Sequence, residues 1–181
     1  YNNPAESGVA QLPSGSLTTA GAFLPHVAID WHFLQNHELY FDMAENLRGY
    51  SYGGYQSGSL PSAWQAHDQA AFQELKKTLK PERTWVYTLG YRYNSKIFSA
   101  SADIYRVNYF NRMQSITTGT LVDPHSTVTN VGNVNLNGAD AEIVLRPIKN
   151  LSISSSMSYA HSVYGNNLVS IDTVYQTKGK H

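Results

Sequence analysis

Residues 84–93 read TWVYTLGYRY and alternate strictly between large apolar or aromatic side chains and small or polar ones. An alternation with a period of two predicts a β-strand with two unlike faces. One face of this strand would be aromatic, because it carries Trp85, Tyr87, Leu89, Tyr91 and Tyr93. The other face would be small or polar.

Three further segments show the same pattern, at Val27–Phe33, Ala139–Arg146 and Leu151–Val163. In Leu151–Val163 nearly all residues of one parity are serines, and a serine-lined face does not suit a dry protein core. The chain is therefore predicted to be all-β, an antiparallel meander of about seven strands.

The connections between these strands alternate between short and long. Short turns are expected at Leu34–His37, Asn94–Lys96 and Pro147–Asn150, and long polar connections at Ser51–Pro81, Thr118–Thr127 and Gly165–Ser170. Short turns at one end and long loops at the other are typical of transmembrane β-barrels of the outer membrane. Within the longest, extracellular connection, the spacing of apolar residues over Ser62–Leu79 predicts one short amphipathic helix.

Aromatic residues gather near the predicted strand ends, as they do at the two interfaces of a membrane barrel. One predicted girdle near the short turns comprises Trp31, Phe33, Tyr91, Tyr93 and Phe98. A second, near the long loops, comprises Tyr105, Tyr109, Phe110, Tyr159 and Tyr164. Along Ile97–Thr117 the large apolar residues change from even-numbered to odd-numbered positions. A β-bulge near Ile104–Arg106 would keep both sets on one face of the strand.

Composition excludes several classes of protein. The 181 residues hold 13 Lys+Arg and 13 Asp+Glu, so the formal net charge is zero and a nucleic-acid partner is not expected. There is no cysteine, and no apolar run approaches the roughly 18 residues of a membrane helix. The seven histidines form no pair at metal-ligand spacing. We therefore expect no metal, no cofactor, no catalytic residues and no enzymatic activity.

Two sets of residues are candidates for binding. Five charged residues share the parity opposite the apolar band, which in a barrel is the lumen, where they would contact a plug: Asp30, Arg92, Asp140, Glu142 and Arg146. Five residues in or beside the longest loop could contact a ligand from outside: Arg48, Tyr52, Tyr55, Trp64 and His67. Solvation or mutual pairing is the competing interpretation for both sets.

Several motifs resemble those of TonB-dependent outer-membrane receptors. Leu79–Trp85, which reads LKPERTW, is similar to the "LKPE…W" block of that family, and Asn130–Glu142 resembles its "NVG…GvE" strand. Leu151–Tyr159 is similar to the strand that follows in the family. Upstream, Phe23–Pro25 and Ala44–Arg48 resemble a strand start and a strand end. Five motifs occur in the order in which the family has them.

This resemblance implies a transporter of 22 antiparallel strands around a plug, in the outer membrane of a Gram-negative bacterium. It would import a scarce solute such as a ferric siderophore, with energy from the inner-membrane TonB complex, and its other partners would be outer-membrane lipid and its own plug. At about ten residues per strand, 22 strands need more chain than the 181 residues given. Residues 1–181 are thus expected to be a single partial domain, without plug, signal peptide or C-terminal strands.

Two other classes compete with this interpretation. In a soluble β-sandwich or lectin-like binding domain, the apolar faces of two sheets would meet in a core. An enzyme inside a barrel would need a catalytic grouping, and no motif of the sequence places one.

Overall fold

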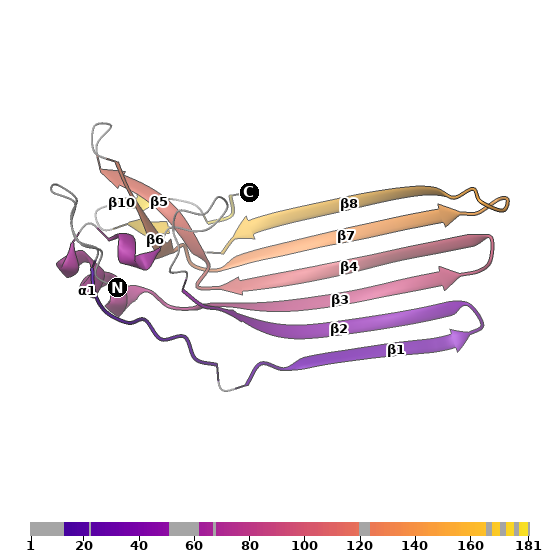
Figure 1. The fold of residues 1–181 in the computed structure, drawn as a ribbon, viewed down its shortest axis with the longest axis horizontal. Coiled ribbons are helices and arrows are strands. Elements are labelled where there is room, and N and C mark those ends of the chain that lie inside the picture. Colours follow the sequence, from indigo (N-terminus) through magenta and orange to yellow (C-terminus); the bar gives the residue numbers. More distant parts are fainter. Residues whose placement is uncertain are drawn as a thin grey trace.

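The computed structural model describes residues 13–21, 23–50, 62–66, 68–119, 124–165, 168–170, 173–175 and 178–180. Its main element is one antiparallel sheet of six strands in the order β1-β2-β3-β4-β7-β8. The six strands run side by side over most of the length of the molecule (Figure 1). Their bounds are β1 His26–Leu34, β2 His37–Arg48, β3 Glu82–Asn94, β4 Phe98–Phe110, β7 Val134–Leu145 and β8 Ile153–Tyr164.

Tight turns join the long strands at one end of the sheet, and all three predicted short turns are confirmed. Asn36 and Asn150 take positive φ angles of 74° and 68° in two of these turns. Asparagine adopts this left-handed conformation more readily than other residues with a Cβ atom.

The opposite end carries the other elements, η1 Ala63–Gln65, α1 Gln69–Thr78 and two short hairpins (Figure 1). The predicted helix within Ser62–Leu79 is confirmed. It begins where the Asp68 carboxylate accepts a hydrogen bond from the Ala71 amide at 2.7 Å. Among the described residues, no helix is long and apolar enough to cross a membrane.

The long connection predicted around Thr118–Thr127 lies between β4 and β7 and contains two paired strands that the sequence did not predict: β5 Met113–Gly119 and β6 Pro124–Asn130. A second short hairpin pairs β9 Leu168–Ser170 with β10 Thr173–Tyr175. The count of about seven strands therefore corresponds to six long strands and four short ones. The β-branched residues that flank Gly119 were the signal for the first hairpin.

The predicted β-bulge near Ile104–Arg106 is also wrong. β4 pairs with β3 and β7 without a slip, and Tyr105 lies opposite Thr88 on one side and Gly138 on the other. The apolar pattern breaks because Tyr105 lies on the polar face, where its ring covers Gly138. No extra residue is needed to explain the pattern.

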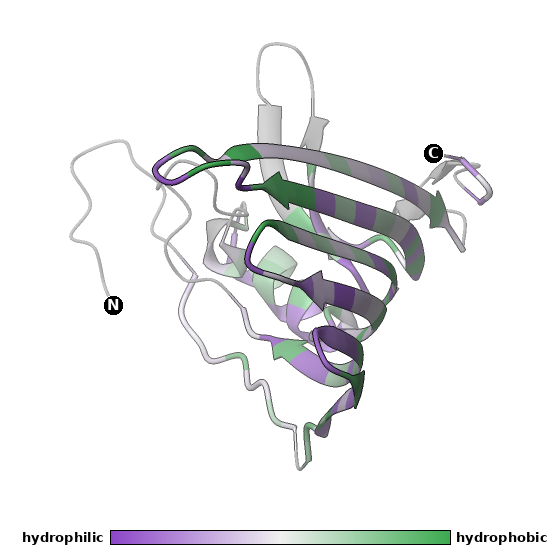
Figure 2. Ribbon diagram, turned by 90° about the vertical axis from the view of Figure 1, so that its right-hand side faces the viewer, coloured by the Kyte–Doolittle hydropathy of each residue, from purple (hydrophilic) through white to green (hydrophobic). Residues whose placement is uncertain are grey.

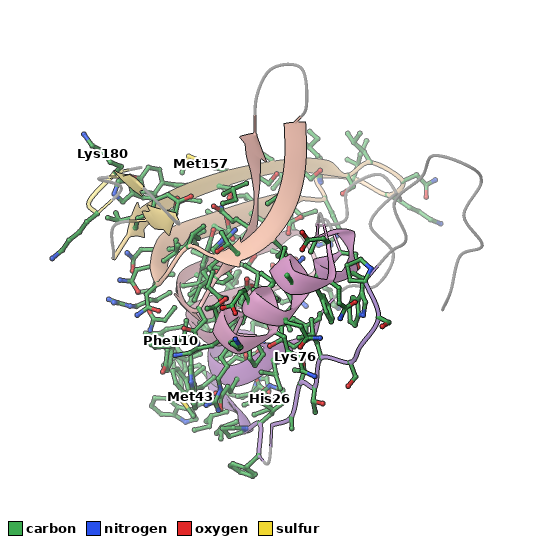
Figure 3. All side chains as sticks on the ribbon, turned by 90° about the vertical axis from the view of Figure 1, so that its left-hand side faces the viewer. His26, Met43, Lys76, Phe110, Met157 and Lys180 are labelled. Carbon is green, nitrogen blue, oxygen red and sulfur yellow. The ribbon has the colours of Figure 1, made fainter. Side chains whose placement is uncertain are left out.

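The six strands curve into an arc, and their residues alternate in hydropathy along each strand (Figure 2). Figure 3 looks along the strands from the end that carries α1 and shows Met43 and Met157 on the convex side. The apolar side chains of this outer face are exposed, with Ile104 at 61% and Met157 at 73%. The β-sandwich alternative is wrong, because no second sheet among the described residues covers this face.

The small hydrophobic core lies in the loops and not under the sheet. Four buried residues form it, Ala63, Leu79, Met113 and Val128, and Leu17, Tyr50, Trp64 and Leu75 pack against them. We call residues 13–21, 62–66, 68–81, 111–119 and 124–133 the loop layer. It joins segments that are far apart in the sequence.

Candidate functional site

The polar face of the sheet gathers the charged residues that the sequence singled out. The register aligns Asp30, Tyr40, Gly90, Asp103, Asp140 and Ser158 in one row across the six strands. The next row toward the turns contains Glu38, Arg92, Ser101, Glu142 and Ser156. Arg146 continues the parity of Glu142 just beyond β7. All five residues predicted for this face therefore lie on it.

Four of these side chains form a continuous network. The Tyr40 hydroxyl donates a hydrogen bond to Asp103 Oδ2 at 3.0 Å. The Arg92 guanidinium lies over the Tyr40 ring, 4.0 Å from its centroid, and donates to Glu38 Oε1 at 2.8 Å. One cation is thus held by a carboxylate and an aromatic ring together. Parity alone could have identified Glu38, Tyr40 and Asp103, which the sequence analysis did not name.

The other charged residues of this face differ in their partners. The Ser158 hydroxyl donates to Asp140 Oδ1, and Arg146 Nη1 donates to Ser99 Oγ at 2.9 Å. In the part of the chain that the structure describes, Asp30 and Glu142 make no hydrogen bond or ion pair. The polar face therefore offers two uncommitted carboxylates next to a hydrogen-bonded network.

The predicted ligand-binding residues fall into two groups. Arg48 Nη1 lies 3.9 Å from Glu82 Oε2, and the Arg48 side chain is 50% exposed. Trp64 is half-buried, its indole N–H donates to the Gly15 carbonyl at 3.0 Å, and its ring packs on Phe72 with centroids 5.9 Å apart. Tyr52, Tyr55 and His67 lie outside the described residues. Arg48 and Trp64 thus lie at the same end of the sheet, Arg48 at the strand end and Trp64 in the loop layer.

Two polar side chains that sequence reasoning missed hold the loop layer in place, one by joining it to β3 and the other by joining its segments. The buried Glu82 carboxylate accepts a hydrogen bond from the Met113 amide at 2.7 Å. Asn130 Oδ1 accepts from the Lys80 amide at 2.7 Å, while its Nδ2 donates to the Lys80 and Asn111 carbonyls at 2.9 and 2.6 Å. Both side chains satisfy backbone groups that no sheet or helix partner satisfies.

Tyr50 adds a third attachment where the chain leaves β2. Its hydroxyl donates to the Leu79 carbonyl at 3.1 Å. The Tyr50 ring is partly buried against the small hydrophobic core of the loops. This burial raises the pKa of the Tyr50 phenol above its usual 10.0, because the phenolate would lose hydration.

The aromatic residues near the turns lie together on the apolar face, as predicted. Ring contacts run from Trp31 through Phe33 to His37, at 5.4 and 5.7 Å between centroids, and from His37 to Tyr93 at 4.9 Å. Tyr93 in turn lies 5.9 Å from Phe98. His37, which the sequence analysis did not include, connects the rings of β1 to those of β3.

The second predicted girdle is wrong in part, because its members divide between the two faces. Phe110 and Tyr159 lie on the apolar face, and Figure 3 shows Phe110 on the convex side. Tyr105, Tyr109 and Tyr164 lie on the polar face, and the Tyr164 hydroxyl is 3.3 Å from Gln114 Nε2. Sequence proximity to the strand ends did not reveal this, since parity decides the face.

This arrangement suits reversible binding by hydrogen bonds and charge. No set of three or more His, Asp or Glu within the described ranges is placed to hold a metal ion. The groups present are carboxylates, guanidinium groups and phenols, which recognise polar or charged partners without covalent chemistry.

Comparisons with known proteins agree with the geometry. A family model described as TonB dependent receptor-like, beta-barrel matches residues 2–181. The copper transporter OprC is similar in structure, with a TM-score of 0.58 and 18% identity over 76% of this chain and 20% of that chain. The FrpB iron transporter from Neisseria meningitidis (F3-3 variant) gives 0.53 and 14% over 77% of this chain and 19% of that chain. The chain thus spans about a fifth of the length of either structure, and the likeness concerns the fold. No curated protein matches the chain.

Proposed function

Because the chain belongs to the TonB-dependent receptor β-barrel family, we propose that its six long strands form part of the wall of an outer-membrane transporter. Barrels of this family lie in the outer membrane of Gram-negative bacteria, and they are transporters, not enzymes. The observation that carries the proposal is the single curved sheet with one exposed apolar face and one polar face.

The apolar face supports this orientation toward lipid. Moving a large aliphatic or aromatic side chain from water into an apolar environment gains about 1.5–3 kcal/mol. Exposed examples occur on all but one of the six strands, among them Ile29, Leu89, Ile104, Ile143 and Met157. The aromatic cluster from Trp31 to Phe98 then lies at the interface near the short turns.

On the same proposal, the polar face lines the lumen of a 22-stranded barrel and contacts a plug. Asp30 and Glu142 are the uncommitted acceptors for plug donors. Arg92, Asp140 and Arg146 already have hydrogen-bond partners on the sheet, so they form a hydrophilic wall next to the plug. A plug coupled to the TonB complex would move along this wall.

The loop end is the proposed entry for cargo, with Arg48, Tyr52, Tyr55, Trp64 and His67 as contacts. This set combines one cation with several aromatic side chains, a composition that suits an anionic chelate such as a ferric siderophore. OprC and FrpB, which have a similar fold, are described as copper and iron transporters. A metal-containing solute is therefore the cargo class to test first.

The test is energised uptake by cells. A strain that lacks the full-length transporter is complemented with wild type or variants, and uptake of radiolabelled ferric siderophores and of copper is measured with and without TonB. We expect TonB-dependent uptake of a ferric siderophore that Arg48→Ala lowers at least severalfold. Lys76→Ala, which removes an exposed cation on α1, is the matched control and should transport normally. TonB-dependent uptake of copper alone would overturn the siderophore assignment.

A further inference from the structure

The apolar face of the sheet carries a groove that the proposed function leaves unexplained. One hollow of about 440 Å³ has the small side chains of Ala102, Ala139 and Ala141 as its floor, between the taller Tyr91 and Met157. The register explains this shape, because Ala102 and Ala141 face each other across β4 and β7 while Tyr91 and Met157 flank them on β3 and β8. A smooth lipid-facing wall would need larger side chains there.

A second hollow of about 300 Å³ extends the first toward the loop end. The two share Leu89 and Ile104, so they form one groove. The end of the groove nearest the loops is lined by Arg106 and Asn137, which lie opposite each other on β4 and β7. From Ala102 to Arg106 along β4 the groove runs for about 13 Å.

Arg106 is an unusual residue for this face. On the apolar side of the six strands, the residues of the Lys, Arg, Asp and Glu types are Glu45, Arg83 and Arg106. Glu45 and Arg83 pair with each other, with Nη2 and Oε1 2.5 Å apart. Arg106 donates from Nε to Asn108 Oδ1 at 2.9 Å, and its terminal nitrogens have no acceptor among the described residues. A cation left uncompensated beside an apolar band marks a binding function.

These features match the two ends of one lipid molecule. We infer that the groove binds a single acylated, phosphorylated lipid of the outer leaflet, of the lipid A type. An acyl chain lies along Ala102 and Ala141, and a phosphate meets Arg106, with the Asn137 amide as a second donor. Because the loop end is extracellular in the proposed orientation, Arg106 lies on the outer-leaflet side. The inference rests on the proposed orientation of the barrel in the membrane, but it does not depend on which cargo is transported.

The charge distribution favours this occupant over a second protein chain. The groove combines a carbon-lined floor with one cation and one amide at a single end, which matches the apolar chain and the anionic head group of a lipid. An arginine can donate two parallel hydrogen bonds to a phosphate, and Nε is already held by Asn108, which fixes the orientation of the guanidinium.

Native mass spectrometry of the full-length transporter in detergent tests the inference. The probes are bisphosphorylated lipid A, the same lipid A after removal of its phosphates, and phosphatidylglycerol. We expect preferential retention of phosphorylated lipid A by the wild type. Arg106→Gln should weaken that retention about tenfold, and Arg106→Lys less, because it keeps the charge. Ala102→Leu should also weaken it, since the added carbons fill the floor.

Ala100→Leu is the matched control, because Ala100 lies on the same strand and face but outside both hollows. Heat-modifiable migration of each variant on a gel checks that the barrel has folded. If the wild type retained phosphorylated and dephosphorylated lipid A equally, that result alone would overturn the inference, whatever the variants did. Equal retention of phosphatidylglycerol would overturn the assignment to lipid A. The uptake experiment above remains independent of either result.

Discussion

The ring of Tyr40 lies directly against Gly90 on the neighbouring strand, so closely that a Cβ atom on Gly90 would be 2.2 Å from Tyr40 Cζ. Tyr105 covers Gly138 in the same way, also at 2.2 Å. In each pair the glycine gives the tyrosine ring space to lie flat on the polar face. The Tyr40 hydroxyl can then reach Asp103, two strands away.

Gly90→Ala is expected to destabilise the folded sheet by about 1–3 kcal/mol, because the methyl group displaces the Tyr40 ring and breaks its hydrogen bond to Asp103. Urea unfolding of the full-length protein in detergent, followed by tryptophan fluorescence, measures the change. Gly49→Ala is the control, since its Cβ would meet only Thr19 at an ordinary 3.8 Å. Equal stability of the two variants would show that the close contact is not a constraint.

Asn130→Ala should loosen the loop layer while leaving the six-stranded sheet intact. The side chain makes three hydrogen bonds to the backbone of Lys80 and Asn111, so its loss leaves those groups unsatisfied at a cost of about 1–3 kcal/mol. Hydrogen exchange at residues 78–82 and 111–116 should rise. Asn135→Ala, on β7, is the control, and an unchanged exchange pattern in Asn130→Ala would contradict the role assigned to the side chain.

Substitutions of Glu82 and of Arg48 are expected to differ in their effect on the structure of the loop layer. Glu82→Ala removes the acceptor of the buried Met113 amide and should speed its hydrogen exchange, whereas Glu82→Gln keeps an acceptor oxygen and should have a smaller effect. Arg48→Gln should change exchange less, because the half-exposed guanidinium lies 3.9 Å from Glu82 Oε2, beyond hydrogen-bond distance, and the buried carboxylate keeps its hydrogen bond to the Met113 amide. A large exchange effect of Arg48→Gln would assign it a structural role.

The loop layer should weaken in alkali. The pKa of Tyr50 is raised above 10.0 by burial, so the folded protein holds the phenolic proton more tightly than the unfolded chain does. Its contribution to stability is therefore complete below pH 10.0 and falls as the pH rises through 10.0 toward the folded pKa. Proteolysis of the loop layer should accelerate over that interval, and this step should be absent in Tyr50→Phe. An identical pH profile in the variant would exclude Tyr50 as its source.

The face of each long strand followed from the sequence, because side chains alternate with a period of two whatever the strand pairs with. Arg92 and Asp140 were placed on the polar face by parity alone, and the register agrees. The prediction from alternation failed along residues 105–109 of β4. There Tyr105, Val107 and Tyr109 lie on the polar face, and their size was mistaken for a change of register.

The partners of the polar groups could not be derived in this way. Tyr40 and Asp103 are 63 residues apart, and Asn130 and Lys80 are 50 apart. Each contact depends on the pairing of several strands and on where the loops return to the sheet. Local sequence patterns carry no information about contacts between residues so far apart in the sequence.

An antiparallel, two-faced sheet with short turns at one end could be predicted from the residues alone, because alternation, turn residues and strand length are local properties. The ion pairs, the small core shared by the loops, and the position of Arg106 beside a groove with an alanine floor became visible in the folded chain. Hydrogen bonds, ion pairs and hollows form between strands, so they depend on the register that the assembled sheet fixes.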